Sequence, residues 1–159
     1  MTMYTPVNTY NTVKVKKYSD VVEEYKAYAA ITPGNLIEIY STDGYVRKHS
    51  TEGGNAIPMF ALEDELQGKG IDEDYDAGDQ VQCWIPGRGD QVYALLEDGE
   101  TIVIGDWLMS NGAGRLQKVD AETLSAAEAL SVIAQSLEAV DLSGSSGTET
   151  TQRLLVRII

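Results

Sequence analysis

Short stretches in which apolar and polar residues alternate make up much of the chain, and most of them end at a turn signal. "NLIEIY", "QVQCWI" and "QVYALL" are three of these stretches. Alternation with a period of two is typical of a half-buried β-strand. Asp43-Gly44 and Asp98-Gly99 lie between such stretches, where a tight hairpin turn is expected. The pattern predicts an all-β protein, a β-rich barrel or sandwich.

Only residues 120–140 have the composition of a helix. Ser125, followed three residues later by Glu128, resembles a capping box, and the alanines beside them have high helix propensity. Length alone favours one long helix, but the repeat described below assigns residues 133–140 to a strand. We therefore expect one short helix around residues 121–131. The Ser- and Gly-rich segment 143–151 predicts a flexible loop before a closing strand in "RLLVRII".

Two parts of the sequence resemble each other and suggest an internal duplication, with units at residues 31–85 and 102–158. The matched pairs are Ile31/Ile102, Gly34/Gly105, Asn35/Asp106, Leu36/Trp107, Ile37/Leu108, Gly44/Gly114, Val46/Leu116 and Lys48/Lys118. Each unit continues with a Leu-Glu step and closes with an alternating strand. Chance similarity is the alternative, because Gly-turn-strand sequences resemble one another in any β protein.

The first 20 residues differ from the rest of the chain, because they are rich in Thr, Asn and Tyr and carry lysines. We expect an extended N-terminal arm at residues 1–20 and a single β-rich domain at residues 21–159. The alternation of Val13 and Val15 with lysines predicts a strand in the second half of the arm. The arm suits docking to a partner, and the alternatives are a frayed end or packing against the acidic body. The docking residues are expected to be Tyr4, Tyr10, Lys14, Lys16, Lys17 and Tyr18.

Composition narrows the function. The chain has 159 residues, 43% of them hydrophobic, which is enough for one domain with a core. A formal net charge of -13 repels phosphates, so we expect no nucleic-acid partner. The N-terminus lacks the apolar stretch of a secretory signal, and no apolar run reaches the roughly 18 residues of a membrane helix. We expect synthesis in a cytoplasm and no membrane partner.

Residues suited to catalysis are few. His49 is the only histidine and Cys83 the only cysteine, and Cys83 lies between apolar neighbours, where a buried side chain is expected. No nucleophile elbow or phosphate loop occurs, so we expect neither an enzyme nor a cofactor. The acidic loop "GIDEDYDAGD" invites a calcium hypothesis, but its spacing fails the EF-hand pattern, and a solvated loop is the alternative. Its aspartates are Asp72, Asp74, Asp76 and Asp79.

The tripeptide Arg88-Gly89-Asp90 matches a cell-adhesion signal, yet it belongs to a recurring Gly-Asp pair that precedes a strand. In each pair Gly supplies the unusual backbone angles of a turn and Asp caps nearby amides. The pairs are Gly78 with Asp79, Gly89 with Asp90, and Gly105 with Asp106. We therefore expect turn formers rather than an adhesin. Among the aromatic residues, Trp84 and Trp107 are expected in the core, and Tyr25 and Tyr28 in ordinary packing.

Several strings, in order, resemble the capsid decoration (cement) proteins of tailed bacteriophages. They are "ITPGNLIEI", "AIPMFALEDELQGKGIDEDYDAGDQV", "GDWLMSNGAGRLQKV", "SLEAVDLSG" and "RLLVRII". The resemblance covers roughly residues 31–159. It implies a non-enzymatic structural protein on the capsid exterior of the virion, made in the host cytoplasm. Such proteins bind the major capsid protein, often as homotrimers, and clamp neighbouring subunits, with extended termini that suggest a clamp role for the arm.

Two alternatives stay open from the sequence. The first is another virion β-module, such as the base of a head fibre or a tail component. The second is a soluble module that binds a ligand or carbohydrate.

Overall fold

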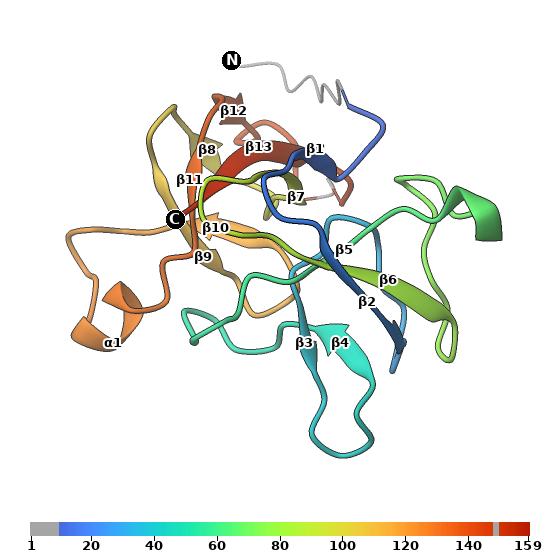
Figure 1. Cartoon of the computed structure of the whole chain (residues 1–159). Helices are drawn as coiled ribbons and strands as arrows, with labels where there is room; N and C mark the ends of the chain where they lie inside the picture. Colours follow the sequence, from blue (N-terminus) through green and yellow to red (C-terminus); the bar gives the residue numbers. More distant parts are fainter. Residues whose placement is uncertain (1–9, 148–149) are drawn as a thin grey trace.

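The computed structural model describes residues 10–147 and 150–159, and almost all of its regular structure is β-strand (Figure 1). The strands are β1 (Lys14–Lys16), β2 (Val21–Lys26), β3 (Ile37–Ile39), β4 (Val46–Lys48), β5 (Phe60–Ala61), β6 (Gln80–Ile85), β7 (Gln91–Leu95), β8 (Thr101–Ile102), β9 (Trp107–Ser110), β10 (Leu116–Lys118), β11 (Ala134–Ser136), β12 (Val140–Asp141) and β13 (Arg153–Ile158). A 3-10 turn η1 (Glu65–Gln67) and a helix α1 (Ala126–Ala129) complete the described elements.

The strands form four sheets, all with antiparallel strand pairs, so the all-β prediction is confirmed, although the described strands do not close into a barrel. The largest sheet has the order β1-β7-β13-β11-β9-β10. The others are β2-β6-β5, the hairpin β3-β4, and the pair β12-β8. An isolated bridge from Leu36 to Phe60 connects β5 to the start of β3, so the order β2-β6-β5-β3-β4 is continuous.

This continuous order repeats in the second half of the chain as β7-β13-β11-β9-β10, and the register repeats with it. Ile37 opposes Lys48 in the first hairpin, and the matched Leu108 opposes Lys118 in the second. Equivalent backbone bonds recur elsewhere. The pairs of bonds, donor first, are Gly34 to Ala61 and Gly105 to Ser136; Tyr28 to Val46 and Glu97 to Leu116; Leu62 to Gln82 and Leu137 to Leu155; His49 to Leu36 and Val119 to Trp107. The unit at residues 21–85 thus has the same topology as the unit at residues 91–158.

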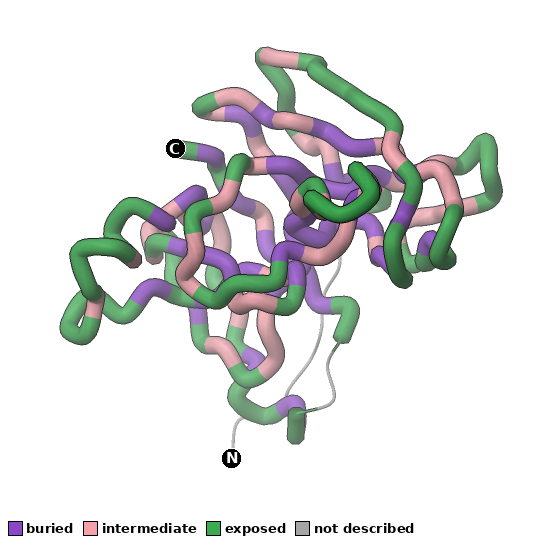
Figure 2. Tube along the Cα trace, turned by 90° about the horizontal axis from the view of Figure 1, so that it is seen from below, coloured by how far each residue is buried: buried purple, intermediate pink, exposed green. Residues whose placement is uncertain are grey.

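Two hydrophobic clusters form the core, and Figure 2 shows that buried residues gather in the interior of the molecule while the outlying loops are mostly exposed. The smaller cluster is the inner face of the first unit. Most of its members have a counterpart in the larger cluster, namely Ala27/Leu96, Ile31/Ile102, Ile37/Leu108, Val46/Leu116, Met59/Ala134, Val81/Leu154 and Cys83/Val156. The two units therefore bury the same face.

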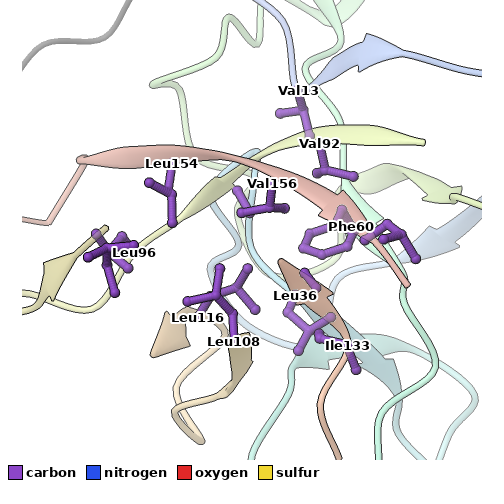
Figure 3. Close-up of a cluster of buried hydrophobic side chains, with 14 of the residues drawn as sticks. Val13, Leu36, Phe60, Val92, Leu96, Leu108, Leu116, Ile133, Leu154 and Val156 are labelled. Atoms are coloured by element: carbon purple, nitrogen blue, oxygen red, sulfur yellow. The ribbon is translucent and has the colours of Figure 1, made fainter. Parts of the chain in front are cut away.

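The larger cluster also holds side chains from the opposite, outer face of the first unit. They are Leu36, Phe60, Leu62 and Trp84, and Figure 3 shows Leu36 and Phe60 among residues of the second unit. The outer face of unit one thus packs on the inner face of unit two. The turn between β9 and β10 completes this contact, because the Leu36 amide and the Asn35 side-chain amide both donate to the Gly114 carbonyl, at 2.8 and 2.9 Å.

Gly114 makes this contact possible because it lacks a side chain. It has φ of +76°, and a Cβ there would lie 2.9 Å from the Lys48 Cβ. The matched Gly44 has nearly the same φ, +75°, but a Cβ there would meet nothing within 4 Å. The two glycines therefore share a backbone conformation and differ only in what surrounds them.

Replacing Gly114 by alanine is expected to lower the free energy of unfolding by about 1–2 kcal/mol more than replacing Gly44 by alanine. Both variants carry the strain of a left-handed alanine, which costs about 1 kcal/mol, and only Gly114→Ala adds overpacking between the units. Urea denaturation followed by tryptophan fluorescence measures both. Equal losses would show that the turn does not press on the first unit.

The local predictions met different outcomes. The helix is confirmed but shorter than expected, and the capping box of Ser125 and Glu128 is present. Asp43-Gly44 closes the β3–β4 hairpin as predicted. The hairpin predicted at Asp98-Gly99 is wrong, since β7 pairs with β13 and β1 whereas β8 pairs with β12. A turn does occur there, but the chain passes to another sheet.

Candidate functional site

The described part of the N-terminal segment lies on the body as part of the largest sheet. β1 pairs with β7, Val13 is fully buried, and the Val13 carbonyl accepts a 2.8 Å bond from the Tyr93 amide. The Tyr10 ring packs edge-on against Tyr93, with centroids 5.1 Å apart. This arrangement corresponds to the packed-back alternative for residues 10–20, while Tyr4 and the rest of residues 1–9 lie outside the described residues.

The lysines proposed for docking already have neighbours within the chain. Lys14 forms an ion pair with Asp20 at 2.7 Å, and Lys17 pairs with the same carboxylate. These two hydrogen bonds hold the pKa of Asp20 below its ordinary value. The Lys16 ammonium lies over the Tyr18 ring, 5.4 Å from the centroid, and Tyr18 is 73% exposed. Tyr18 thus presents most of its surface to solvent.

The three Gly-Asp pairs adopt one turn geometry. Gly78, Gly89 and Gly105 have φ of +89°, +93° and +94°. In each pair a carboxylate oxygen accepts the amide three residues earlier, and the matched Asn35 does the same with its amide oxygen. These bonds run from Asp76 to Asp79, Gly87 to Asp90, Val103 to Asp106, and Thr32 to Asn35, all at 2.8–2.9 Å. This hydrogen bond fixes the turn that precedes each strand.

Asp90 differs from the other two aspartates because it is fully buried. Besides the Gly87 amide it accepts the Tyr18 amide at 2.5 Å, which ties the N-terminal segment to this turn. A carboxylate in this environment does not reach a receptor. The geometry of the tripeptide therefore supports a turn and offers nothing to an adhesion partner.

The acidic loop disperses its carboxylates among separate partners. Asp72 pairs with Arg153 at 2.5 Å, and Asp74 accepts the Thr32 hydroxyl at 2.6 Å. Asp79 caps its own turn, 3.5 Å from the Lys69 ammonium. Within residues 10–147 and 150–159, no group of three or more His, Cys, Asp or Glu side chains could hold a metal ion. No helix of this described part is long and apolar enough to cross a membrane.

His49 links the two units. Its ring is 2% exposed, with Nδ1 2.7 Å from the Ser110 hydroxyl and Nε2 3.2 Å from the Asn55 carbonyl. Glu38 lies 3.7 Å away. Partial burial of Glu38 opposes its ionisation, yet hydrogen bonds from Ser50 and Arg47 keep its pKa below the ordinary value. The cluster holds the β3–β4 hairpin against the second unit.

Cys83 is fully buried in the smaller cluster, and burial raises the pKa of its thiol from 9.0 to about 12. Burial also raises the pKa of Tyr75 above 10.0.

The unfolded chain loses the Cys83 and Tyr75 protons first as the pH rises, so stability should be constant up to about pH 9 and decrease above it. Urea midpoints between pH 7 and 10 measure this decrease. Cys83→Ala should show a shallower decrease between pH 9 and 10; an unchanged slope would contradict the assignment to Cys83.

An open apolar pocket lies on the inner face of the first unit. It has a volume of about 320 Å³ and its lining includes Ile37, Met59 and Ile85. Ile39 and Ile57 at its rim are 53% and 75% exposed. We call it the β3 pocket. Exposed branched aliphatic side chains around a hollow are typical of an interaction surface.

A second pocket, here the Trp107 pocket, lies on the outer face of the second unit. It has a volume of about 580 Å³, and Trp107 lies beside Asp106, Lys118 and Val119 in its lining. The core position predicted for Trp107 is wrong, since the side chain is 48% exposed, whereas Trp84 is buried as predicted. The Lys118 ammonium is 2.9 Å from the Asp106 carboxylate. Although partial burial opposes ionisation, the Val103 amide and Lys118 lower the pKa of Asp106.

Neither pocket was predicted from the sequence, although the match between Trp107 and Leu36 in the repeat could have indicated the Trp107 pocket. Trp107 matches Leu36, which the second unit covers, whereas Trp107 itself is 48% exposed among the described residues. The tyrosine prediction was mixed. Tyr25 packs against the smaller cluster, whereas Tyr28 is 48% exposed and contacts Tyr40 with the rings tilted by 58° and their centroids 4.7 Å apart.

Comparisons with known proteins give one informative result. No family model and no curated protein matches the sequence. Among solved structures, the fold is similar to that described as "The crystal structure of head fiber gp8.5 N base in bacteriophage phi29". The TM-score is 0.53 at 17% sequence identity, and the match covers 89% of this chain and 95% of that chain. At this identity the likeness shows a common fold.

Proposed function

We propose that the protein is a non-enzymatic structural component of a bacteriophage virion that binds the outer surface of the head. The observation that carries this proposal is the fold shared with the phi29 head fiber base over nearly the full length of both chains. The apolar pockets and the acidic surface suit a binding protein that stays soluble until it reaches its partner.

The partner in this proposal is the major capsid protein, and the protein acts on the capsid exterior. Two modes of action follow from the two resemblances. The fold likeness favours the base of a head fibre, which anchors a longer appendage. The sequence resemblance to decoration proteins favours a clamp, in which one homotrimer joins adjacent capsid subunits and stabilises the shell through multivalent contacts.

In the clamp mode the N-terminal segment reaches the capsid, and the structure sharpens how this is tested. Deleting residues 1–20 would remove β1 and the buried Val13, so lost binding would be confused with misfolding. Deleting residues 1–9 removes none of the described strands. We expect this shorter deletion to reduce occupancy on purified heads at least tenfold without changing the thermal midpoint.

Co-sedimentation of the protein with heads of its own phage measures occupancy. The matched control is Lys14→Gln with Lys17→Gln, because both ammonium groups already pair with Asp20, and this variant should bind normally. Full-length protein that fails to bind the heads overturns the proposed function. Normal binding by the shorter deletion overturns only the clamp role of the arm and leaves the fibre base as the favoured mode.

A further inference from the structure

The contact between the two units joins unlike faces, so it leaves one face of each kind without a counterpart. Inside the chain, unit two contributes its inner face and the Gly114 turn, and unit one contributes its outer face around Leu36. Because the units share one topology, unit one retains an inner face and a turn, and unit two retains an outer face. Within the described residues, the outer face of unit two is open around Trp107, whereas the inner face of unit one is buried at its centre in the smaller cluster and open at the β3 pocket.

The open outer face is the Trp107 pocket. Its lining residues Asp106, Trp107, Lys118 and Val119 match Asn35, Leu36, Lys48 and His49 of the first unit. In the first unit this same set receives the Gly114 turn, since Gly114 accepts from Leu36 and Asn35 and donates its amide to the His49 carbonyl at 3.1 Å. The Trp107 pocket therefore has the form of an acceptor for a glycine-bearing hairpin turn, in which the Trp107 amide corresponds to the Leu36 donor. The Asp106 carboxylate, unlike the Asn35 side-chain amide, cannot donate to the glycine carbonyl.

The exposed part of the inner face of unit one includes the β3–β4 hairpin and the β3 pocket. Gly44, which matches Gly114, lies at the tip of this hairpin, and the tip extends away from the rest of the molecule at the bottom of Figure 1. The β3 pocket is lined by Ile37 and Ile85, whose counterparts Leu108 and Ile158 are buried against the first unit. This face corresponds to the inner face and turn of unit two, which pack on unit one within the chain.

We propose that a second copy of the chain fills the Trp107 pocket with its β3–β4 turn, in a head-to-tail contact that repeats the internal one. Gly44 of one copy takes the place of Gly114, and its β3 pocket covers the outer face around Trp107 of the next copy. Such a heterologous contact continues from copy to copy and closes into a ring when the rotation permits. A ring of three copies gives the homotrimer named in the proposed function. The inference rests on the proposed function for this homotrimer, but it does not depend on binding to the capsid.

Disulfide trapping tests the contact directly. Asp43→Cys places a thiol beside Gly44, and Lys118→Cys places one in the Trp107 pocket. The two variants are purified separately, mixed and oxidised with copper phenanthroline, and we expect a disulfide-linked dimer in the mixture only. The native Cys83 does not interfere, because it is buried and its thiol pKa is raised to about 12. Cross-linking no greater in the mixture than in the separate variants overturns the proposal.

Sedimentation velocity gives an independent measurement. Gly44→Arg and Trp107→Glu should each weaken self-association at least tenfold, since the first fills the turn and the second charges its acceptor. A Cβ at Gly44 would meet nothing within 4 Å, so we expect this variant to fold despite the strain of its left-handed backbone, and circular dichroism checks both variants. Leu66→Glu, at a fully exposed residue outside both surfaces, should associate like the original chain. Wild-type protein that is monomeric throughout the micromolar range, or unchanged association in both variants, overturns the proposal.

These measurements use the isolated protein, so they separate this inference from the proposed function. If the protein forms the head-to-tail disulfide but does not bind heads, the self-contact is supported and the proposed role in the virion is wrong. If the protein binds heads but forms no disulfide specific to the mixture, the proposed role in the virion is supported and the self-contact is wrong.

Discussion

Replacing Arg153 by methionine is expected to lower the free energy of unfolding by about 3–5 kcal/mol, the largest loss we expect from a single side chain here. Arg153 lies on β13 of the second unit and is fully buried. Its guanidinium donates to the Pro33 carbonyl at 2.8 Å, to the Ile71 carbonyl, and to the Asp72 carboxylate at 2.5 Å. It thus joins the closing strand to two separate loops of the first unit. Methionine fills a similar length but leaves these acceptors without their donor.

The matched control is Arg157→Met, on the same strand four residues later. Arg157 is exposed, so its loss should change stability by no more than about 0.5 kcal/mol. Urea denaturation with tryptophan fluorescence measures both variants. Similar losses at the two positions would show that the buried guanidinium does not hold the units together.

Replacing Asp90 by alanine is the second large effect, with an expected loss of about 2–4 kcal/mol. The carboxylate accepts two backbone amides, Gly87 at 2.8 Å and Tyr18 at 2.5 Å, in a fully buried position. An amide left without an acceptor in such a place costs about 1–3 kcal/mol. The N-terminal segment should also detach locally, which faster hydrogen exchange of the Tyr18 and Val13 amides would report.

Asp79→Ala is the control, because Asp79 caps an equivalent turn through a single amide and its side chain is 36% exposed. Its expected loss is about 1 kcal/mol. Asp90→Glu should also destabilise, since the longer side chain cannot meet both amides from the same backbone. If Asp90→Glu kept full stability but lost a cell-binding activity, the turn assignment would be wrong and the adhesion signal would be restored.

The local structure of the chain could be predicted from the sequence. Period-two alternation, Gly-Asp pairs and the Ser125 capping box act over a few residues, and each corresponds to an observed strand, turn or helix start. The matched positions of the two units were also readable, down to the glycines with φ of +94° at Gly34 and Gly105. These features depend on backbone conformation and nearest neighbours, which a short window of sequence specifies.

The sequence could not tell which member of a matched pair is buried. Leu36 and Trp107 occupy equivalent positions, yet one is in the core and the other is 48% exposed. Arg153 and Arg157 follow the same alternating pattern, yet only Arg153 crosses to the other unit. The sequence alone therefore determined an all-β chain with defined turns and indicated two similar units. Only the tertiary structure decided which faces meet, because the contact between the units joins the outer face of unit one to the inner face of unit two, and the local pattern of the sequence is the same for both units.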